Sequence, residues 1–171
     1  MKALLDVHYG RETASAACLV FEDWQDDRPL EIIQSIQPVP GPYWAGSFFV
    51  RELPCLLAVL QKTSRTFETL VIDGYVHLKP ENGKGLGMHL YESLACVPKV
   101  VGIAKNPLKI ADRFLPVLRG KSKKPLYVSA QGCPLNLAQG WVQEMHGPYR
   151  LPTLLRLTDR AARTGPDKGC V

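Results

Sequence analysis

The segment Leu70-Val71-Ile72-Asp73-Gly74 constrains the fold of this chain more than any other. Its apolar, largely β-branched run predicts a buried strand, and Asp73 stands where that strand ends. A buried strand has little reason to end in an acid unless the acid faces a site, and ligands of open α/β sheets gather at such strand ends. The alternative is that Asp73 and Gly74 only form a turn, because Asp-Gly is a common turn pair.

The size and composition of the chain suit one globular α/β domain. Its 171 residues predict a domain over residues 1–165, followed by a tail at 166–171. Hydrophobic residues make up 46%, which excludes a disordered protein. The net charge of +5 is compatible with a polyanionic partner without proving one. No apolar run suits a signal peptide or a membrane span, so we expect a cytoplasmic protein without a membrane partner.

The five cysteines are expected to be reduced thiols. Their number is odd and no pair has C-x-x-C spacing, so a disulfide framework and a structural zinc site are both disfavoured. We expect most of them to act as small core residues.

The order of the expected elements indicates one mixed sheet flanked by helices. Three strands at residues 3–7, 14–21 and 30–36 predict an antiparallel meander, with a turn at His8 to Arg11. The further expected segments are a loop at 37–46, a helix at 53–63, a strand at 67–73, a loop at 74–87, a helix at 88–95, a strand at 97–104, a basic turn at 119–124, a strand at 126–129, and helices at 135–145 and 152–163. Pro54 is expected in the first turn of its helix, where proline is tolerated.

Four acids carry the candidate chemistry. Asp6, Glu52 and Asp73 stand at the boundaries of expected elements, and Asp159 lies on the last expected helix. If the strands of Asp6 and Asp73 are neighbours, their backbones lie about 5 Å apart, and both carboxylates stay ionised only with a cation between them. Oxygen ligands suit Mg²⁺ or Mn²⁺, and such an ion fits phosphoryl chemistry. Lys105 would add a positive charge for the same phosphate. Each acid taken alone also fits a solvated or capping group.

Six segments, in order along nearly the whole chain, resemble the endonuclease V family of metal-dependent nucleases that act on deaminated purines in nucleic acid. They are LLDVHY at residues 4–9, the segment from Pro42 to Glu52, VIDG at 71–74, VGIAK at 101–105, YVS at 127–129 and the segment from Tyr149 to Arg160. The resemblance implies an RNase H-like fold, which agrees with a mixed sheet flanked by helices.

The resemblance also implies roles for the acids. Asp6 and Asp73 would bind the metal, with Glu52 and Asp159 completing the acidic site directly or through water. The implied catalytic residues are Asp6, Glu52, Asp73 and Lys105, and Asp159 is added to the metal ligands. The implied cofactor is Mg²⁺, for which Mn²⁺ substitutes.

The implied nucleic-acid-binding residues are Tyr43, Trp44, Gly46, Lys105 and Arg150. Tyr43 would stack in the gap left by a displaced base, which has independent physical sense because an aromatic ring can fill an unstacked step. The alternative is that Tyr43 and Trp44 only anchor their loop. The basic positions are candidates for a backbone-binding surface or for ordinary solvated turns, and they are Lys79, Lys84, Arg119, Lys121, Lys123 and Lys124.

The chain departs from the family pattern around the lesion-reading loops. Trp44-Ala45 replaces isoleucine and proline, and His77 falls two places earlier than the family's histidine. His77 would share a face with Asp73 if the strand extended past Gly74.

From the acidic residues and the family resemblance together, we predict a monomeric, Mg²⁺-dependent endonuclease that hydrolyses a phosphodiester near deaminated bases (inosine, hypoxanthine) in DNA or RNA. The alternatives are a non-catalytic nucleic-acid-binding relative and a structure-specific nuclease with another substrate.

Overall fold

The computed structural model describes residues 1–39, 48–78, 83–96, 98–111 and 113–165. Its elements, in chain order, are β1 (Lys2–Tyr9), β2 (Thr13–Phe21), β3 (Glu31–Pro38), α1 (Phe48–Leu60), β4 (Thr69–Asp73), α2 (Leu86–Glu92), β5 (Lys99–Ala104), β6 (Phe114–Val117), β7 (Leu126–Gln131), α3 (Leu135–Glu144) and α4 (Thr153–Thr164). None of the helices within these ranges has the length and apolar character that crossing a membrane requires.

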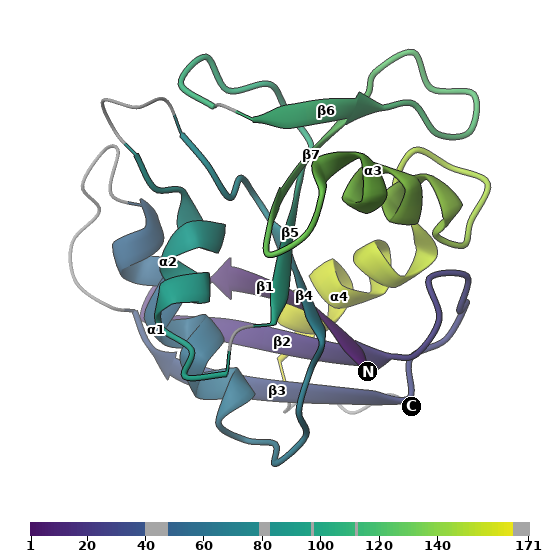
Figure 1. The fold of residues 1–171 in the computed structure, drawn as a ribbon. Coiled ribbons are helices and arrows are strands. Elements are labelled where there is room, and N and C mark those ends of the chain that lie inside the picture. The colour runs from purple at the N-terminus through teal and green to yellow at the C-terminus, as the bar shows by residue number, and fades with distance from the viewer. Residues whose placement is uncertain (40–47, 79–82, 97, 112, 166–171) are drawn as a thin grey trace.

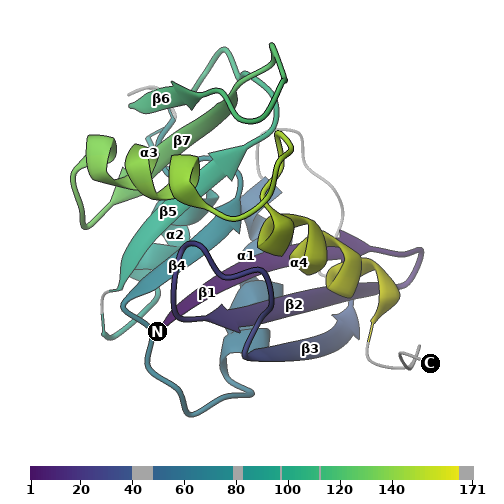
Figure 2. The same cartoon turned by 90° about the vertical axis from the view of Figure 1, so that its right-hand side faces the viewer.

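One seven-stranded mixed sheet runs through the molecule in the order β3-β2-β1-β4-β5-β7-β6. The first three strands form the predicted antiparallel meander. Strands β1, β4 and β5 are parallel, and β7 returns antiparallel to β5. Figures 1 and 2 show α1 and α2 covering one face of the sheet and α3 and α4 covering the other. The predicted mixed sheet flanked by helices is confirmed.

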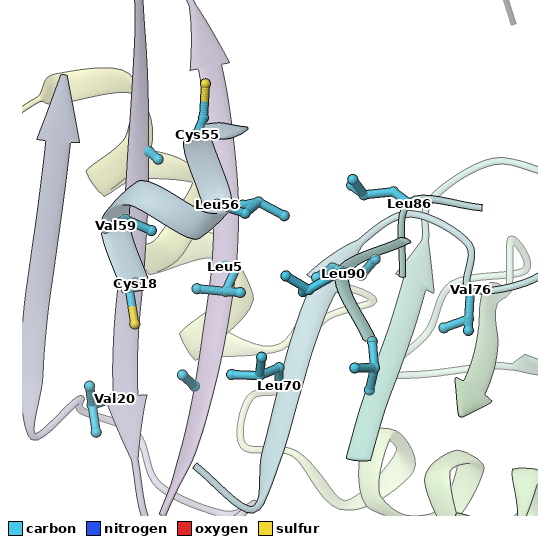
Figure 3. Packing of buried hydrophobic residues seen from close by; sticks show 14 of the residues in the cluster. Leu5, Cys18, Val20, Cys55, Leu56, Val59, Leu70, Val76, Leu86 and Leu90 are labelled. Carbon is cyan, nitrogen blue, oxygen red and sulfur yellow. The ribbon is translucent and has the colours of Figure 1, made fainter. Parts of the chain in front are cut away.

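Alternate residues of the central strands pack into two separate cores. Leu5 and Ile72 face α1 and α2, where they join the side chains shown in Figure 3. Their sequence neighbours Leu4 and Val71 face α3 and α4. A strand buried on both faces has to be apolar throughout, which explains the unbroken run before Asp73. Cys18 and Cys55 lie buried in the first core as free thiols.

Several predicted boundaries were wrong. Helix α1 begins at Phe48, so Glu52 lies inside the helix and Pro54 lies in its interior rather than in its first turn. Proline has no N–H, so Pro54 leaves the Val50 carbonyl without its helical partner. Strand β1 continues through Tyr9, where a turn was predicted. The short strand β6 was missed because it contains a proline, which edge strands tolerate.

Gly102 on β5 lets the chain segment after Asp73 pass close to the sheet. A Cβ atom at this position would lie 2.4 Å from the Gly74 carbonyl oxygen and 2.7 Å from the Ser129 hydroxyl oxygen. We expect Gly102→Ala to lower the free energy of unfolding by about 1–3 kcal/mol, because one of these groups must move. Urea denaturation measures this change.

The matched control for this prediction is Gly140→Ala on α3. A Cβ atom at Gly140 meets nothing within 4 Å. Alanine in a helix is favoured over glycine by about 0.5–1 kcal/mol, so this variant should be slightly more stable than the parent. Equal stability of the two variants would show that the close approach at Gly102 has no energetic consequence.

Candidate active site

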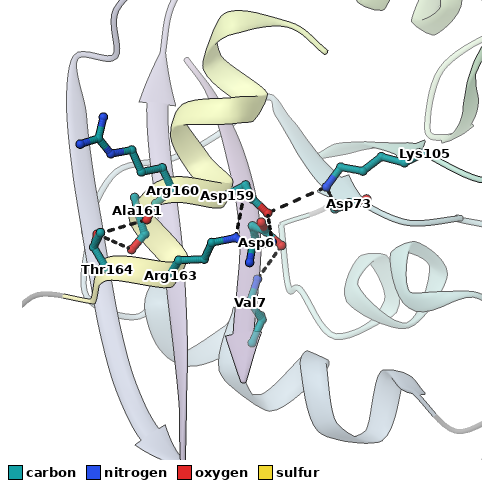
Figure 4. Close-up of polar contacts among 9 residues, drawn as sticks. All are labelled: Asp6, Val7, Asp73, Lys105, Asp159, Arg160, Ala161, Arg163 and Thr164. Carbon is teal, nitrogen blue, oxygen red and sulfur yellow. Dashed lines mark hydrogen bonds and ion pairs between the residues drawn. The ribbon is translucent and has the colours of Figure 1, made fainter. Parts of the chain in front are cut away.

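The four predicted acids converge at one end of the sheet from three layers of the structure. The parallel pairing of β1 and β4 ends with Leu5 opposite Ile72, so Asp6 and Asp73 are the next residues of the two strands. Asp159 reaches the same place from α4 (Figure 4). Glu52 approaches from α1, where it lies in electrostatic contact with Asp6 and Asp73. The register of β1 and β4 thus brings Asp6, within β1, next to Asp73, at the end of β4, although they are far apart in the sequence.

Cationic side chains partly balance these acids. The Lys105 Nζ atom lies 2.5 Å from Asp73 Oδ2 and 4.0 Å from Asp159 Oδ1. Arg163 donates two hydrogen bonds to Asp159, at 2.9 and 3.1 Å. Asp6 Oδ1 accepts a hydrogen bond of 2.8 Å from the Val7 backbone N–H. Figure 4 shows Lys105 and Arg163 approaching the acids from opposite sides.

Burial and neighbouring charges shift the pKa values of acids in the site and of Lys105. Burial, followed by the charge of Asp73, raises the pKa of Asp6 to about 7. Burial, with the charges of Asp6 and Asp73, raises the pKa of Glu52 to about 9. The hydrogen bond from Arg163 lowers the pKa of Asp159. Burial opposes the charge of Lys105, but its contact with Asp73 outweighs burial and raises its pKa. Near pH 7 Glu52 keeps its proton in the metal-free site, because it is buried and lies close to Asp6 and Asp73.

The donor set fits a hard divalent cation in chemistry and charge. Its donors are carboxylate oxygens, the ligands that Mg²⁺ and Mn²⁺ prefer. An added positive charge would favour the ionised forms of Asp6 and Glu52. Across the described ranges, no three His, Cys, Asp or Glu side chains are arranged to hold an ion as they stand. In this arrangement the Lys105 ammonium lies against Asp73 and near Asp159.

An apolar cavity of about 390 Å³ opens beside the acids. Glu52 and Asp73 form part of its wall, and the other lining residues are Phe49, Gly74, Tyr75, Leu78, Lys84, Gly85, Leu86, Leu108 and Ile110. The Tyr75 hydroxyl donates a hydrogen bond of 2.9 Å to the Asn106 carbonyl, which fixes its ring. Sequence reasoning missed this cavity. Its one visible signal was the pair Leu108 and Ile110, two apolar residues in an otherwise polar loop.

Some predicted residues lie away from the acids or outside the described part of the chain. Tyr43, Trp44, Gly46 and Lys79 lie outside the described residues. Arg150 is partly buried and donates to the backbone carbonyls of Lys105 and Pro125, so its contact with nucleic acid stays a prediction.

Two expectations for basic side chains were wrong. Strand β4 ends at Asp73, and the ring of His77 lies 3.1 Å from the Ala130 carbonyl oxygen instead of beside the acids. Arg119 is only 4% exposed, so it is not part of a backbone-binding surface. Arg163, which the sequence reasoning missed, was detectable from its i, i+4 spacing to Asp159.

Comparison with known proteins agrees with this geometry. The endonuclease V family model matches residues 3–160. An endonuclease V of Xanthomonas oryzae is 32% identical over 175 residues, which cover 90% of this chain and 71% of that protein. The crystal structure of endonuclease V from Streptomyces avermitilis superposes with a TM-score of 0.76 at 24% identity, over 95% of this chain and 79% of that one.

A second solved structure shares the fold and contains nucleic acid. Endonuclease V of Ciona intestinalis was crystallised with a 24mer DNA containing an inosine followed by a ribo-adenosine. It superposes with a TM-score of 0.80 at 18% identity, over 95% of this chain and 84% of that one. The sheet and helices described above are therefore an RNase H-like fold.

Proposed function

The chain belongs to the endonuclease V family, and we propose that it is a metal-dependent endonuclease that hydrolyses a phosphodiester near a deaminated base in DNA or RNA. The observation that carries the proposal is the contact between the acidic site and the apolar cavity. Glu52 and Asp73 belong to both. A base held in the cavity would therefore lie next to the acids that promote hydrolysis of its backbone. The inosine-containing DNA bound by the Ciona relative supports this substrate class.

We assign the metal to Asp6, Asp73 and Asp159, with Mg²⁺ as the natural ion and Mn²⁺ as a substitute. The bound ion supplies Lewis-acid stabilisation of the charge that develops on the phosphate. Glu52 is the only one of the four acids that comes from α1. The charge of a bound cation would favour the ionised form of Glu52, and from that side its carboxylate oxygens would orient the attacking water and accept its proton.

Lys105 has the task of balancing charge at the phosphate. In the structure its ammonium is held by Asp73 at 2.5 Å. Asp73 would be one of the residues that hold the metal, and Lys105, which lies beside it, would then contact a phosphate oxygen. A fixed cation at this place stabilises the developing negative charge in a partly buried site, where it acts more strongly than in water.

The cavity receives the extruded base. Enzymes that read a single base in nucleic acid turn it out of the stack into a pocket. A volume of about 390 Å³ lies in the range of small-molecule sites. The rings of Phe49 and Tyr75 provide flat apolar walls for a purine.

Cleavage of matched, end-labelled strands tests this proposal. The strands carry one inosine or one adenosine at the same position, are made as DNA and as RNA, and are incubated with Mg²⁺ or with EDTA. We expect cutting near inosine in Mg²⁺ and none in EDTA. Metal-dependent cutting regardless of inosine would overturn the base specificity and favour a structure-specific nuclease. No cutting of any strand would favour a non-catalytic binding relative.

A further inference from the structure

The backbone of the loop between α3 and α4, residues 145–152, is held by hydrogen bonds from the buried guanidinium of Arg119. Arg119 donates hydrogen bonds to the carbonyls of Met145, Gly147, Tyr149 and Arg150. Hydrogen bonds from a charged donor are stronger than neutral ones. A side chain that the sequence suggested for the surface therefore acts inside the protein, where it fixes the backbone of this loop.

Tyr149 points outward from this fixed backbone. It is 61% exposed, the highest exposure among the large apolar and aromatic side chains of the described residues. The guanidinium carbon of Arg156, on α4, lies 5.3 Å from the centre of its ring. A cation over one aromatic face orients the ring. An exposed, oriented aromatic ring is the element that single-stranded nucleic-acid binders use to stack a base.

Three exposed lysines lie on a turn whose backbone approaches this loop. Lys121, Lys123 and Lys124 belong to the turn between β6 and β7. Gly120 joins that turn to the loop: a Cβ atom on it would lie 2.3 Å from the Pro148 carbonyl oxygen. Figure 1 shows the turn and the loop next to each other. Segments 119–129 and 145–158 contain basic but no acidic residues.

This surface is continuous with the candidate active site. Arg150 follows Tyr149 and donates to the carbonyls of Lys105 and Pro125. Pro125 in turn follows Lys124. The pairing of Ala104 with Tyr127 places the lysine turn at the end of the sheet where β5 delivers Lys105. The Arg150 guanidinium thus connects Lys105, the proposed phosphate-binding residue, with the loop that carries Tyr149 and the turn that carries the lysines.

We propose that Tyr149, Arg156, Lys121, Lys123 and Lys124 form a second nucleic-acid subsite, which binds an unpaired stretch of the strand that continues from the cleaved bond. One nucleobase stacks on Tyr149, and the phosphates beside it contact the lysines. The stretch must be unpaired, because a ring on the protein surface can stack only on a base whose face is uncovered. The location of the subsite relative to the cleaved bond rests on the proposed function.

Binding in EDTA tests the subsite separately from cleavage. The probes are a fluorescein-labelled single strand and a blunt duplex of the same sequence, both without inosine, so that neither metal nor lesion contributes. We expect Tyr149→Ala to weaken single-strand binding about tenfold and duplex binding less than twofold, within the range of base–aromatic stacking. Tyr149→Phe keeps the ring and should bind like the parent. Unchanged thermal unfolding of Tyr149→Ala checks its fold.

The lysines are tested by the salt dependence of the same binding. In the triple variant Lys121→Ala, Lys123→Ala, Lys124→Ala, the slope of log K against log salt concentration should become shallower by about 2, at about 0.7 per lost phosphate contact. Lys62→Ala removes an exposed lysine just past α1 and should leave the slope unchanged.

Equal binding by the parent and Tyr149→Ala, or equal losses for single strand and duplex, would overturn the subsite. An unchanged slope in the triple variant would overturn the role of the lysines. Because no metal and no inosine are present, these outcomes are independent of whether the protein cleaves inosine-containing strands.

Discussion

Replacing Asp73 by asparagine should reduce cleavage near inosine by about a hundredfold to a thousandfold, the loss seen when one transition-state-stabilising group is removed. Asparagine has the size of aspartate and keeps an oxygen that can accept from Lys105. It lacks the negative charge with which Asp73, at the end of β4 and beside β1, would hold a metal. Single-turnover cleavage of an inosine-containing strand in Mg²⁺ measures the effect.

Two comparisons make this result specific to the site. Asp27→Asn changes an exposed aspartate in the loop between β2 and β3 and should cleave like the parent. The thermal unfolding of Asp73→Asn should stay close to that of the parent, which excludes loss of the fold. Cleavage by Asp73→Asn at the parent rate would place the active site elsewhere.

Asp6→Asn should make the metal-free protein more stable, although it also removes cleavage. Burial and the charge of Asp73 raise the pKa of Asp6 from 3.8 to about 7. Each pKa unit corresponds to about 1.4 kcal/mol, so the ionised carboxylate destabilises the metal-free fold by an estimated 2–4 kcal/mol. Asparagine avoids this cost and still accepts the hydrogen bond from Val7.

The sign of this effect depends on pH. A carboxyl whose pKa is higher in the folded protein favours folding at low pH, and this contribution is lost as pH rises from about 4 to about 7. The gain from Asp6→Asn should therefore be largest near pH 8 and shrink toward pH 4. Urea denaturation in EDTA at both ends of this range measures it. Lower stability than the parent at pH 8 would show that the Asp6 carboxylate is not strained by burial and repulsion.

The acidic site lowers the stability of the metal-free fold, and the same acids are the groups on which the proposed reaction depends. Four acids at one end of the sheet repel one another without an added cation, and of the two with raised pKa values Glu52 is buried and Asp6 is partly buried, both beside apolar neighbours. The same repulsion would favour binding of a divalent ion in the proposed metal site. This is the expected relation between stability and activity at a functional site.

The arrangement of Asp6 and Asp73 was predictable because apolar strands leave few choices. Each acid ends a run that must be buried, and a meander leaves one side of β1 open to pair with β4. Periodicity fixes which face a residue occupies and says little about where a helix begins. Helix α1 therefore started earlier than predicted, and Glu52 moved from its boundary to its interior.

The surroundings of the acids depend on contacts that sequence patterns do not encode. The sequence does not show that the Arg119 and Arg150 side chains donate hydrogen bonds to backbone carbonyls instead of facing solvent. The cavity is built from Phe49, Tyr75 and Ile110, which come from three separate segments. Local patterns predict elements and strand ends, whereas these features appear only when the segments are placed in space.

Titration of the metal-free protein with Mn²⁺, followed by electron paramagnetic resonance, tests the central claim most directly. The account predicts that Mn²⁺ binds to the parent protein and to Asp27→Asn, and that binding is lost or strongly weakened in Asp73→Asn. Absence of Mn²⁺ binding to the parent, or equal binding to all three proteins, would contradict a metal site on Asp6, Asp73 and Asp159.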